Sequence, residues 1–316
     1  QLSPYGFERN YIPTPLEMEA QEPTLINAQR EMNRILEGLR EQYAQELYKR
    51  IFWGVAIHEV GHTLGLRHNF EASTDALNFP RTYWNLRVAK SGNEYVPVGL
   101  WGETEQQTAA GLREYQYSSV MDYYAKFNMP WLGIGLYDIA AIKYAYGRTV
   151  EVFNTNPDLT KYQDYLDIDP TTVAPSNLPA FKERGEGFGL ALRRVHATNY
   201  PNFWGDADKI YDRRDVPIDQ VIGERCQTEG AACAGGNVCK RFYEGLRCTP
   251  QDVTMVPYRF GGDELAFGLP TVGVWDEGVD SYEVVNNLTE LYENNWIFAG
   301  YWHQDPTYWP TNYDNS

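Results

Sequence analysis

The chain has 316 residues, of which 43% are hydrophobic, and it is long enough to bury one large core or two smaller ones. Acidic residues number 43 against 27 Lys and Arg, so the formal net charge at pH 7 is −16. Because nucleic acids and anionic membranes both attract clusters of Lys and Arg, this charge argues against either of them as a partner. No apolar run is long enough to cross a bilayer, so we predict a globular chain without a transmembrane segment.

The first three predicted elements precede or contain the most informative motif. Residues 1–23 carry four prolines among polar neighbours, which predicts an extended arm. Over residues 24–47 the apolar positions recur with a period near 3.6 and charged residues lie opposite them, which predicts an amphipathic helix. Apolar residues keep helical spacing over residues 51–65, which predicts a second helix.

The stretch GVAIHEVGHTLGLRHNF holds three of the five histidines of the chain. His58 and His62 are four residues apart, so a helix places them on one face about one turn apart. Gly65 can leave the helix through a left-handed conformation, which lets the chain bring His68 back beside them. Three neutral imidazoles that leave one position for water are typical of a catalytic zinc site rather than a structural one. Glu59 directly follows His58 and can reach that water.

These five positions match the signature H-E-x-x-H-x-x-G-x-x-H of the metzincin zinc peptidases, which the chain resembles here. The resemblance implies that the three histidines bind a zinc ion, which activates a water molecule for attack on a peptide bond. It further implies that Glu59 is the general base that takes the water proton and the general acid that delivers it to the leaving amine. No covalent intermediate is expected.

A methionine-containing turn is predicted downstream in YSSVMDYYAKFNM, residues 117–129, after a stretch of loop with short strands over residues 71–116. Metzincins have such a turn beneath the zinc ligands, and its astacin and serralysin form, S-x-M-x-Y, resembles Ser119, Met121 and Tyr123. The resemblance implies that Met121 forms a polarisable apolar floor for the site. It implies that Tyr123 contacts the metal or a developing oxyanion.

A capped helix is predicted next, over residues 136–147, with Asp138 as its N-cap and Gly147 as its terminator. Its position resembles that of the helix after the Met-turn in serralysins and matrix-type metzincins. Residues 256–296 resemble the region downstream of the Met-turn in large bacterial zinc-dependent metalloproteases. Those proteins are secreted or belong to the cell envelope, and they also carry HEVGHTLGLRHNF almost letter for letter. We therefore expect a bacterial protein that is secreted or lies at the cell surface or envelope.

The four cysteines all lie within residues 224–250, a glycine-rich segment that looks like an insertion in the family. Their spacing lacks the close C-x-x-C pairs of a structural zinc site, so two disulfides are predicted, with all three connectivities open. Disulfides persist in oxidising compartments, which also favours a secreted or cell-surface protein. The cysteines are Cys226, Cys233, Cys239 and Cys248.

A weaker metal site is conceivable where Asp206, Asp208 and Asp212 lie close together in sequence, because calcium prefers oxygen ligands. The EF-hand pattern is absent, so a solvated acidic turn is the favoured interpretation and calcium binding is the alternative. The two remaining histidines, His196 and His303, are expected to bind no metal.

The resemblance implies an α+β fold with a zincin-like (metzincin) catalytic core, predominantly helical in this chain. Metzincins place a mixed sheet before the zinc helix, and its edge strand pairs with the extended substrate. Only 57 residues precede His58, and they are predicted as arm and helix. We therefore expect the sheet in an upstream segment of a precursor or in a partner chain. The predicted divisions are the arm over 1–23, catalytic helices and Met-turn over 24–150, and a family-specific C-terminal region over 151–316.

Two functions follow from these residues. The favoured one is an extracellular zinc endopeptidase that acts on a protein or peptide substrate. The alternative is a structural or adhesive component of an extracellular assembly that retains the zinc site. The missing sheet and the cysteine-rich insertion favour the alternative, whereas Glu59 favours the enzyme because a purely structural metal needs no base.

Overall fold

The computed structural model describes residues 23–99, 102–124, 129–155, 157, 197–242, 245–250, 253–266, 268–269, 272–280, 282–290 and 292. The predicted arm, apart from Pro23, lies outside these residues, and so do His196 and His303. The chain divides into two compact units, Gln1–Phe52 and Trp53–Ser316.

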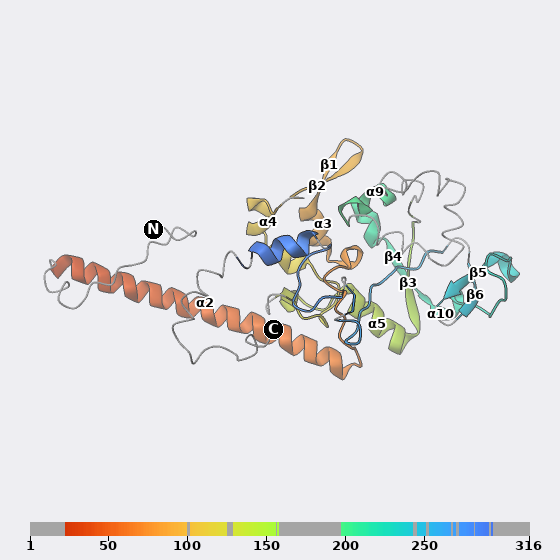
Figure 1. Cartoon of the computed structure of the whole chain (residues 1–316), viewed down its shortest axis with the longest axis horizontal. Coiled ribbons are helices and arrows are strands. Elements are labelled where there is room, and N and C mark those ends of the chain that lie inside the picture. The colour runs from red at the N-terminus through yellow and green to blue at the C-terminus, as the bar shows by residue number, and fades with distance from the viewer. Residues whose placement is uncertain are drawn as a thin grey trace. The chain divides into compact units, whose positions relative to one another are not determined.

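The two helices predicted over 24–47 and 51–65 are a single α-helix, α2 (Pro23–Thr63), so that prediction was wrong (Figure 1). The intervening residues contain neither Pro nor Gly, and nothing there stops the helix from propagating. The helix ends at Thr63, and Gly65 then takes the left-handed φ of 86° that was predicted for it. Within the described part of the chain, no helix has the length and apolarity needed to cross a membrane.

The region predicted as loop with short strands also contains helices. The antiparallel strands β1 (Val88–Ser91) and β2 (Glu94–Pro97) are joined by a tight turn in which Gly92 has a φ of 63°. A capping box formed by Thr104 and Gln107 starts α4 (Glu105–Ala109). The other helical elements here are η1 (Ala76–Asn78), α3 (Arg81–Arg87) and η2 (Leu112–Tyr115). A further 3-10 helix, η3 (Met129–Leu132), lies beyond this region.

The predicted helix over 136–147 is α5 (Leu136–Gly147), with the predicted bounds, but both predicted capping residues need correction. Gly135, not Asp138, is the N-cap, and Asp138 lies three residues further on, where its carboxylate accepts from the Gly135 N–H at 2.8 Å. Gly147 is still helical, and it is Arg148 that takes the left-handed conformation with a φ of 51°.

The described strands form three antiparallel two-stranded sheets. Besides β1–β2 these are β3 (Thr149–Phe153) with β4 (Arg213–Pro217), and β5 (Asn237–Phe242) with β6 (Gly245–Pro250). This mixture of helices and small sheets is compatible with an α+β fold. The remaining elements are η6 (Ala197–Asn199), α9 (Tyr200–Trp204), η7 (Ala207–Tyr211), α10 (Ile218–Val221) and η8 (Ala234–Gly236), and residues 282–290 are also helical.

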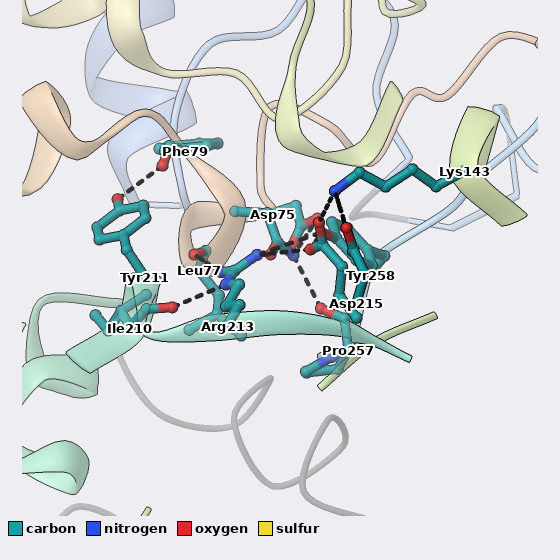
Figure 2. A network of polar contacts seen from close by, with 12 residues as sticks. Asp75, Leu77, Phe79, Lys143, Ile210, Tyr211, Arg213, Asp215, Pro257 and Tyr258 are labelled. Atoms are coloured by element: carbon teal, nitrogen blue, oxygen red, sulfur yellow. Dashed lines mark hydrogen bonds and ion pairs between the residues drawn. The ribbon is translucent and has the colours of Figure 1, made fainter. Parts of the chain in front are cut away.

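Residues far apart in the sequence share the largest apolar core. Phe79, Tyr83 and Trp84 pack in one buried cluster with Phe203 and Ile210, among others. A buried guanidinium ties the same segments together, because Arg213 donates to the carbonyl oxygens of Ile210 at 2.8 Å and Leu77 at 3.1 Å (Figure 2). Residues on both sides of position 150 therefore contribute to one core, while the three predicted divisions remain predictions.

The cysteine-rich segment forms the two predicted disulfides and selects one of the three connectivities. Cys226 is bonded to Cys239, and Cys233 to Cys248. Cys239 and Cys248 are directly opposite each other in the β5–β6 hairpin, so each anchors a different disulfide. Disulfides persist in oxidising compartments, so these two are consistent with an extracellular protein.

Candidate metal centre

The three histidines of the motif converge in the structure. His58 and His62 project from α2, and the turn through Gly65 brings His68 back to them. Their ligand atoms all lie within 4.8 Å of one another. The Nε2 atoms of His62 and His68 are 3.2 Å apart. Two ligands of a tetrahedral zinc ion with Zn–N bonds of about 2.0–2.1 Å would be separated by about 3.3 Å, so the spacing fits zinc.

Each imidazole is oriented by a hydrogen bond from its other ring nitrogen. The Nδ1–H of His58 donates to the carbonyl oxygen of Val120 at 2.7 Å, and that of His62 donates to the carbonyl oxygen of Leu66 at 3.0 Å. The Nδ1–H of His68 donates to a carboxylate oxygen of Asp263 at 2.7 Å. These bonds assign the tautomer and leave the Nε2 lone pairs for a metal. The cluster can therefore hold a metal ion, and each candidate ligand has a hydrogen-bond acceptor that holds its ring in place.

Electrostatics favour the protonation states that a metal needs. Burial is the largest effect on His58 and lowers its pKa, which keeps the ring neutral and able to bind a metal. The hydrogen bond from His68 lowers the pKa of Asp263, so that carboxyl group remains a carboxylate.

Met121 packs directly against α2 at Gly61. Its side chain is fully buried, in a cluster against which Ile57 and Leu66 pack. A Cβ atom at Gly61 would overlap its Sδ atom. Gly61, an unspecified position of the histidine motif, is thus required for the close approach of helix and turn. The sequence analysis did not identify this role.

Asp138 connects the Met-turn to α5. Its buried carboxylate accepts from the Ser119 hydroxyl at 2.6 Å and from the Val120 N–H at 2.8 Å. The Ser119 hydroxyl oxygen in turn accepts from the Met121 N–H at 3.0 Å. Since the carbonyl oxygen of Val120 orients His58, α5 positions a metal-binding imidazole through Asp138 and the turn.

Tyr123 and Glu59 both lie near the three imidazoles. The Tyr123 hydroxyl donates to Nε2 of His68 at 2.9 Å, a bond that a metal ion on that nitrogen would replace. Burial, and then the charges of Asp263 and Glu59, raise the pKa of Tyr123, so the phenol keeps its proton at neutral pH. Glu59 is exposed, and its charge also acts on His58. A proton donor and a carboxylate are therefore both available beside the imidazoles.

Asp263 is a site residue that the sequence analysis missed. Its segment is fixed to the motif by Asn69, whose side chain donates to the Arg259 carbonyl oxygen at 3.1 Å and accepts from the Gly261 N–H at 3.1 Å. Phe70 adds a backbone bond to Gly261 at 2.7 Å. Asp263 is far from His68 in sequence, and no spacing rule connects the two. The resemblance of residues 256–296 to metalloproteases was the one available signal.

The three aspartates considered for calcium are directed to other groups. Asp206 accepts from the Tyr95 hydroxyl at 2.9 Å, and Asp212 accepts from the Asn154 side chain at 2.8 Å. Asp208 pairs with Arg81 at 3.4 Å. The solvated acidic turn therefore stays the favoured interpretation, and calcium binding there stays the untested alternative. Among the described residues, the one other group of potential ligands consists of Cys226, Cys233 and Cys248, which are in disulfides.

Comparison with known proteins agrees with this geometry. A family model described as Met-zincin matches residues 40–79, which include Glu59 and the three histidines but neither Met121 nor Tyr123. The match supports a metzincin-type family, for which zinc is the implied metal, and a zinc metalloprotease-like function. No curated protein and no solved structure matches the chain.

Proposed function

We propose that the chain is an extracellular zinc-dependent endopeptidase, secreted or held at a bacterial cell surface or envelope. The observation that carries the proposal is the set of three outward Nδ1 hydrogen bonds, which leaves the Nε2 atoms of His58, His62 and His68 facing one another. A bound zinc ion would supply Lewis-acid activation of a water molecule and of the scissile carbonyl group.

Glu59 has the role of general base and acid in this proposal. It follows a ligand directly on α2, and its charge acts on both His58 and Tyr123. Its carboxylate accepts a proton from the attacking water and then delivers that proton to the departing amine. This role requires no covalent bond between enzyme and substrate.

Tyr123 serves as an electrostatic partner of the reaction. Its raised pKa keeps the phenol protonated, and the hydroxyl already points at the metal-binding side of His68. It donates a hydrogen bond to the substrate carbonyl oxygen as negative charge develops there. Asp263 contributes indirectly, by holding the His68 ring in place.

The decisive experiment separates metal binding from proton transfer. Glu59→Gln should retain zinc at the wild-type stoichiometry, because the ligands are untouched, and should lose about 10²- to 10⁴-fold in peptide hydrolysis. Zinc content by mass spectrometry and digestion of a peptide library measure the two quantities. Glu94→Gln, on β2, is a matched control that should change neither. A wild-type chain that binds zinc and cleaves no peptide would favour the structural or adhesive alternative.

The expected partner segment is part of this proposal. Trp53 and Val60 lie seven residues apart and hence on one side of α2, and both are 55% exposed, although this helix carries two of the imidazoles; Val55 is 45% exposed. Contiguous exposed apolar surface is typical of interaction sites. We propose that a sheet from another segment or chain covers this side of the helix and pairs with substrate. Full peptidase activity of the zinc-loaded chain as an isolated monomer would exclude that requirement.

A further inference from the structure

A second aromatic ring borders the metal centre beside Tyr123. The rings of Trp275 and Tyr123 are stacked, with centroids 5.3 Å apart and planes inclined by 26°. Tyr123 in turn lies 4.7 Å from the ring of His68, to which its hydroxyl donates. Trp275 is therefore separated from an imidazole of the metal centre by one aromatic ring.

The backbone of Trp275 is held in an unfavourable conformation. Its φ is 66°, a left-handed value that a bulky side chain rarely adopts. Its N–H donates to the Tyr123 carbonyl oxygen at 2.8 Å. The next residue, Asp276, is buried, bridges to Tyr124 and accepts from the Ser73 hydroxyl at 3.1 Å. These bonds fix the residue in place, and strain that is maintained in this way is common at functional sites.

The strain does not serve to bury the indole. Trp275 is 47% exposed, whereas Val272 and Asp276 in the same segment are 1% and 7% exposed. A tryptophan that only filled the core would be covered like these neighbours. The segment is thus anchored by its buried residues and presents a large aromatic surface next to the proposed reaction site.

We propose that Trp275 determines substrate specificity, and that its exposed indole surface binds an aromatic or large apolar side chain of the peptide close to the cleaved bond. The indole offers a flat apolar surface, and aromatic side chains stack on such a surface with a gain beyond simple burial. This inference rests on the proposed peptidase function and adds the class of substrate side chain.

The first test compares cleavage preferences of zinc-loaded full-length variants. Trp275→Gly removes the ring, and glycine adopts a φ of 66° without steric cost. Trp275→Asn is a second ring deletion that tolerates the same backbone, in case the glycine variant does not fold. Trp275→Phe keeps an aromatic surface. Tyr144→Ala, which removes an aromatic residue of α5 that is 54% exposed, is the matched control.

The expected readout is the ratio of kcat/KM for matched peptides with Phe and with Ala at the position that the wild type selects in a library digest. The ring deletions should reduce this ratio by about 3- to 10-fold, while Trp275→Phe and Tyr144→Ala keep it. A ring deletion that leaves the ratio unchanged would overturn the proposal. So would an equal loss of rate on both peptides, because the ring would then act only by supporting Tyr123.

A binding test does not depend on catalysis. Phenylalanine hydroxamate and glycine hydroxamate are titrated calorimetrically into the zinc-loaded wild type and ring-deletion variants. We expect the phenylalanine compound to bind the wild type about 3- to 10-fold more tightly, and this preference to disappear in the ring deletions. If this holds but no peptide is cleaved, the peptidase function fails and the aromatic binding surface stands. If peptides are cleaved and neither test shows a preference, the inference about Trp275 is wrong and the peptidase function stands.

Discussion

Three regions of the chain build the candidate metal centre, and two of them differ most in how readily the sequence reveals their role. Residues 58–75 carry the histidine motif and lie within the matched Met-zincin segment. Residues 257–276 carry no recognisable spacing, yet they supply Asp263 behind His68 and Trp275 against Tyr123. The candidate ligands are therefore a local feature of one helix and turn, whereas Val120 and Asp263, which orient His58 and His68, come from segments far away in the sequence.

The largest effect is expected from a contact between these two regions, and it should appear in the pH dependence of the free energy of unfolding. Asp75 is buried and accepts from the Arg259 N–H at 3.2 Å, and burial raises its pKa from 3.8 to about 6. Between these values the folded state binds more protons than the unfolded state, so stability should fall as the pH rises from about 4 to about 6. The shift corresponds to about 3 kcal/mol.

The measurement is urea unfolding of the wild type and Asp75→Asn at several pH values across this window. The variant cannot titrate at this position, so its stability should fall less with rising pH. Equal losses in both chains would show that Asp75 is not a source of the dependence.

A smaller effect is expected from the carboxylate that the downstream region places behind His68. Asp263→Ala should weaken zinc binding by about 10- to 100-fold, because the imidazole loses its orienting acceptor. Competition with a chelator of known affinity measures it. Glu264→Ala is the matched control, since that neighbouring carboxylate pairs with Arg67 instead. Equal zinc affinities for the two variants would show that the downstream region does not support the candidate metal centre.

The next test concerns the motif region itself. Gly61→Ala forces a Cβ atom into Met121 Sδ and should destabilise the fold by about 1–3 kcal/mol. Gly38→Ala, in the same helix with nothing within 4 Å of the added atom, should be neutral or stabilising by up to about 1 kcal/mol. Urea unfolding of both variants gives the comparison, and a Gly61→Ala chain as stable as Gly38→Ala would contradict the close packing.

The smallest effect is expected for Met121→Leu, with Met121→Ala as its contrast. Met121→Leu conserves volume and apolarity, so it should cost less than about 1.5 kcal/mol and leave zinc affinity unchanged. Met121→Ala would leave a cavity in a fully buried site and should cost about 2–5 kcal/mol. Thermal unfolding and chelator competition check both. A large loss of zinc affinity in the leucine variant would show that the sulfur atom acts specifically on the metal.

The helices and the turn at Gly65 show which features could be predicted from local sequence patterns. The existence of the helices around His58 and over 136–147 was predictable from apolar periodicity, and so was the left-handed Gly65. The start of the helix around His58 and the capping residues of the helix over 136–147 were not. Asp138 looks like an N-cap by residue type, but tertiary structure uses its carboxylate to hold Ser119 and Val120.

The amino-acid sequence was enough to predict three candidate metal ligands and two disulfides, because the period of an α-helix fixes which imidazoles share a face and clustered cysteines form disulfides in an oxidising compartment. It could not predict which cysteines are joined, that Asp263 lies behind His68 or that Trp275 stacks on Tyr123. The physical reason is distance along the chain. A local spacing is set by backbone geometry alone, whereas a contact between remote segments depends on how the whole core packs.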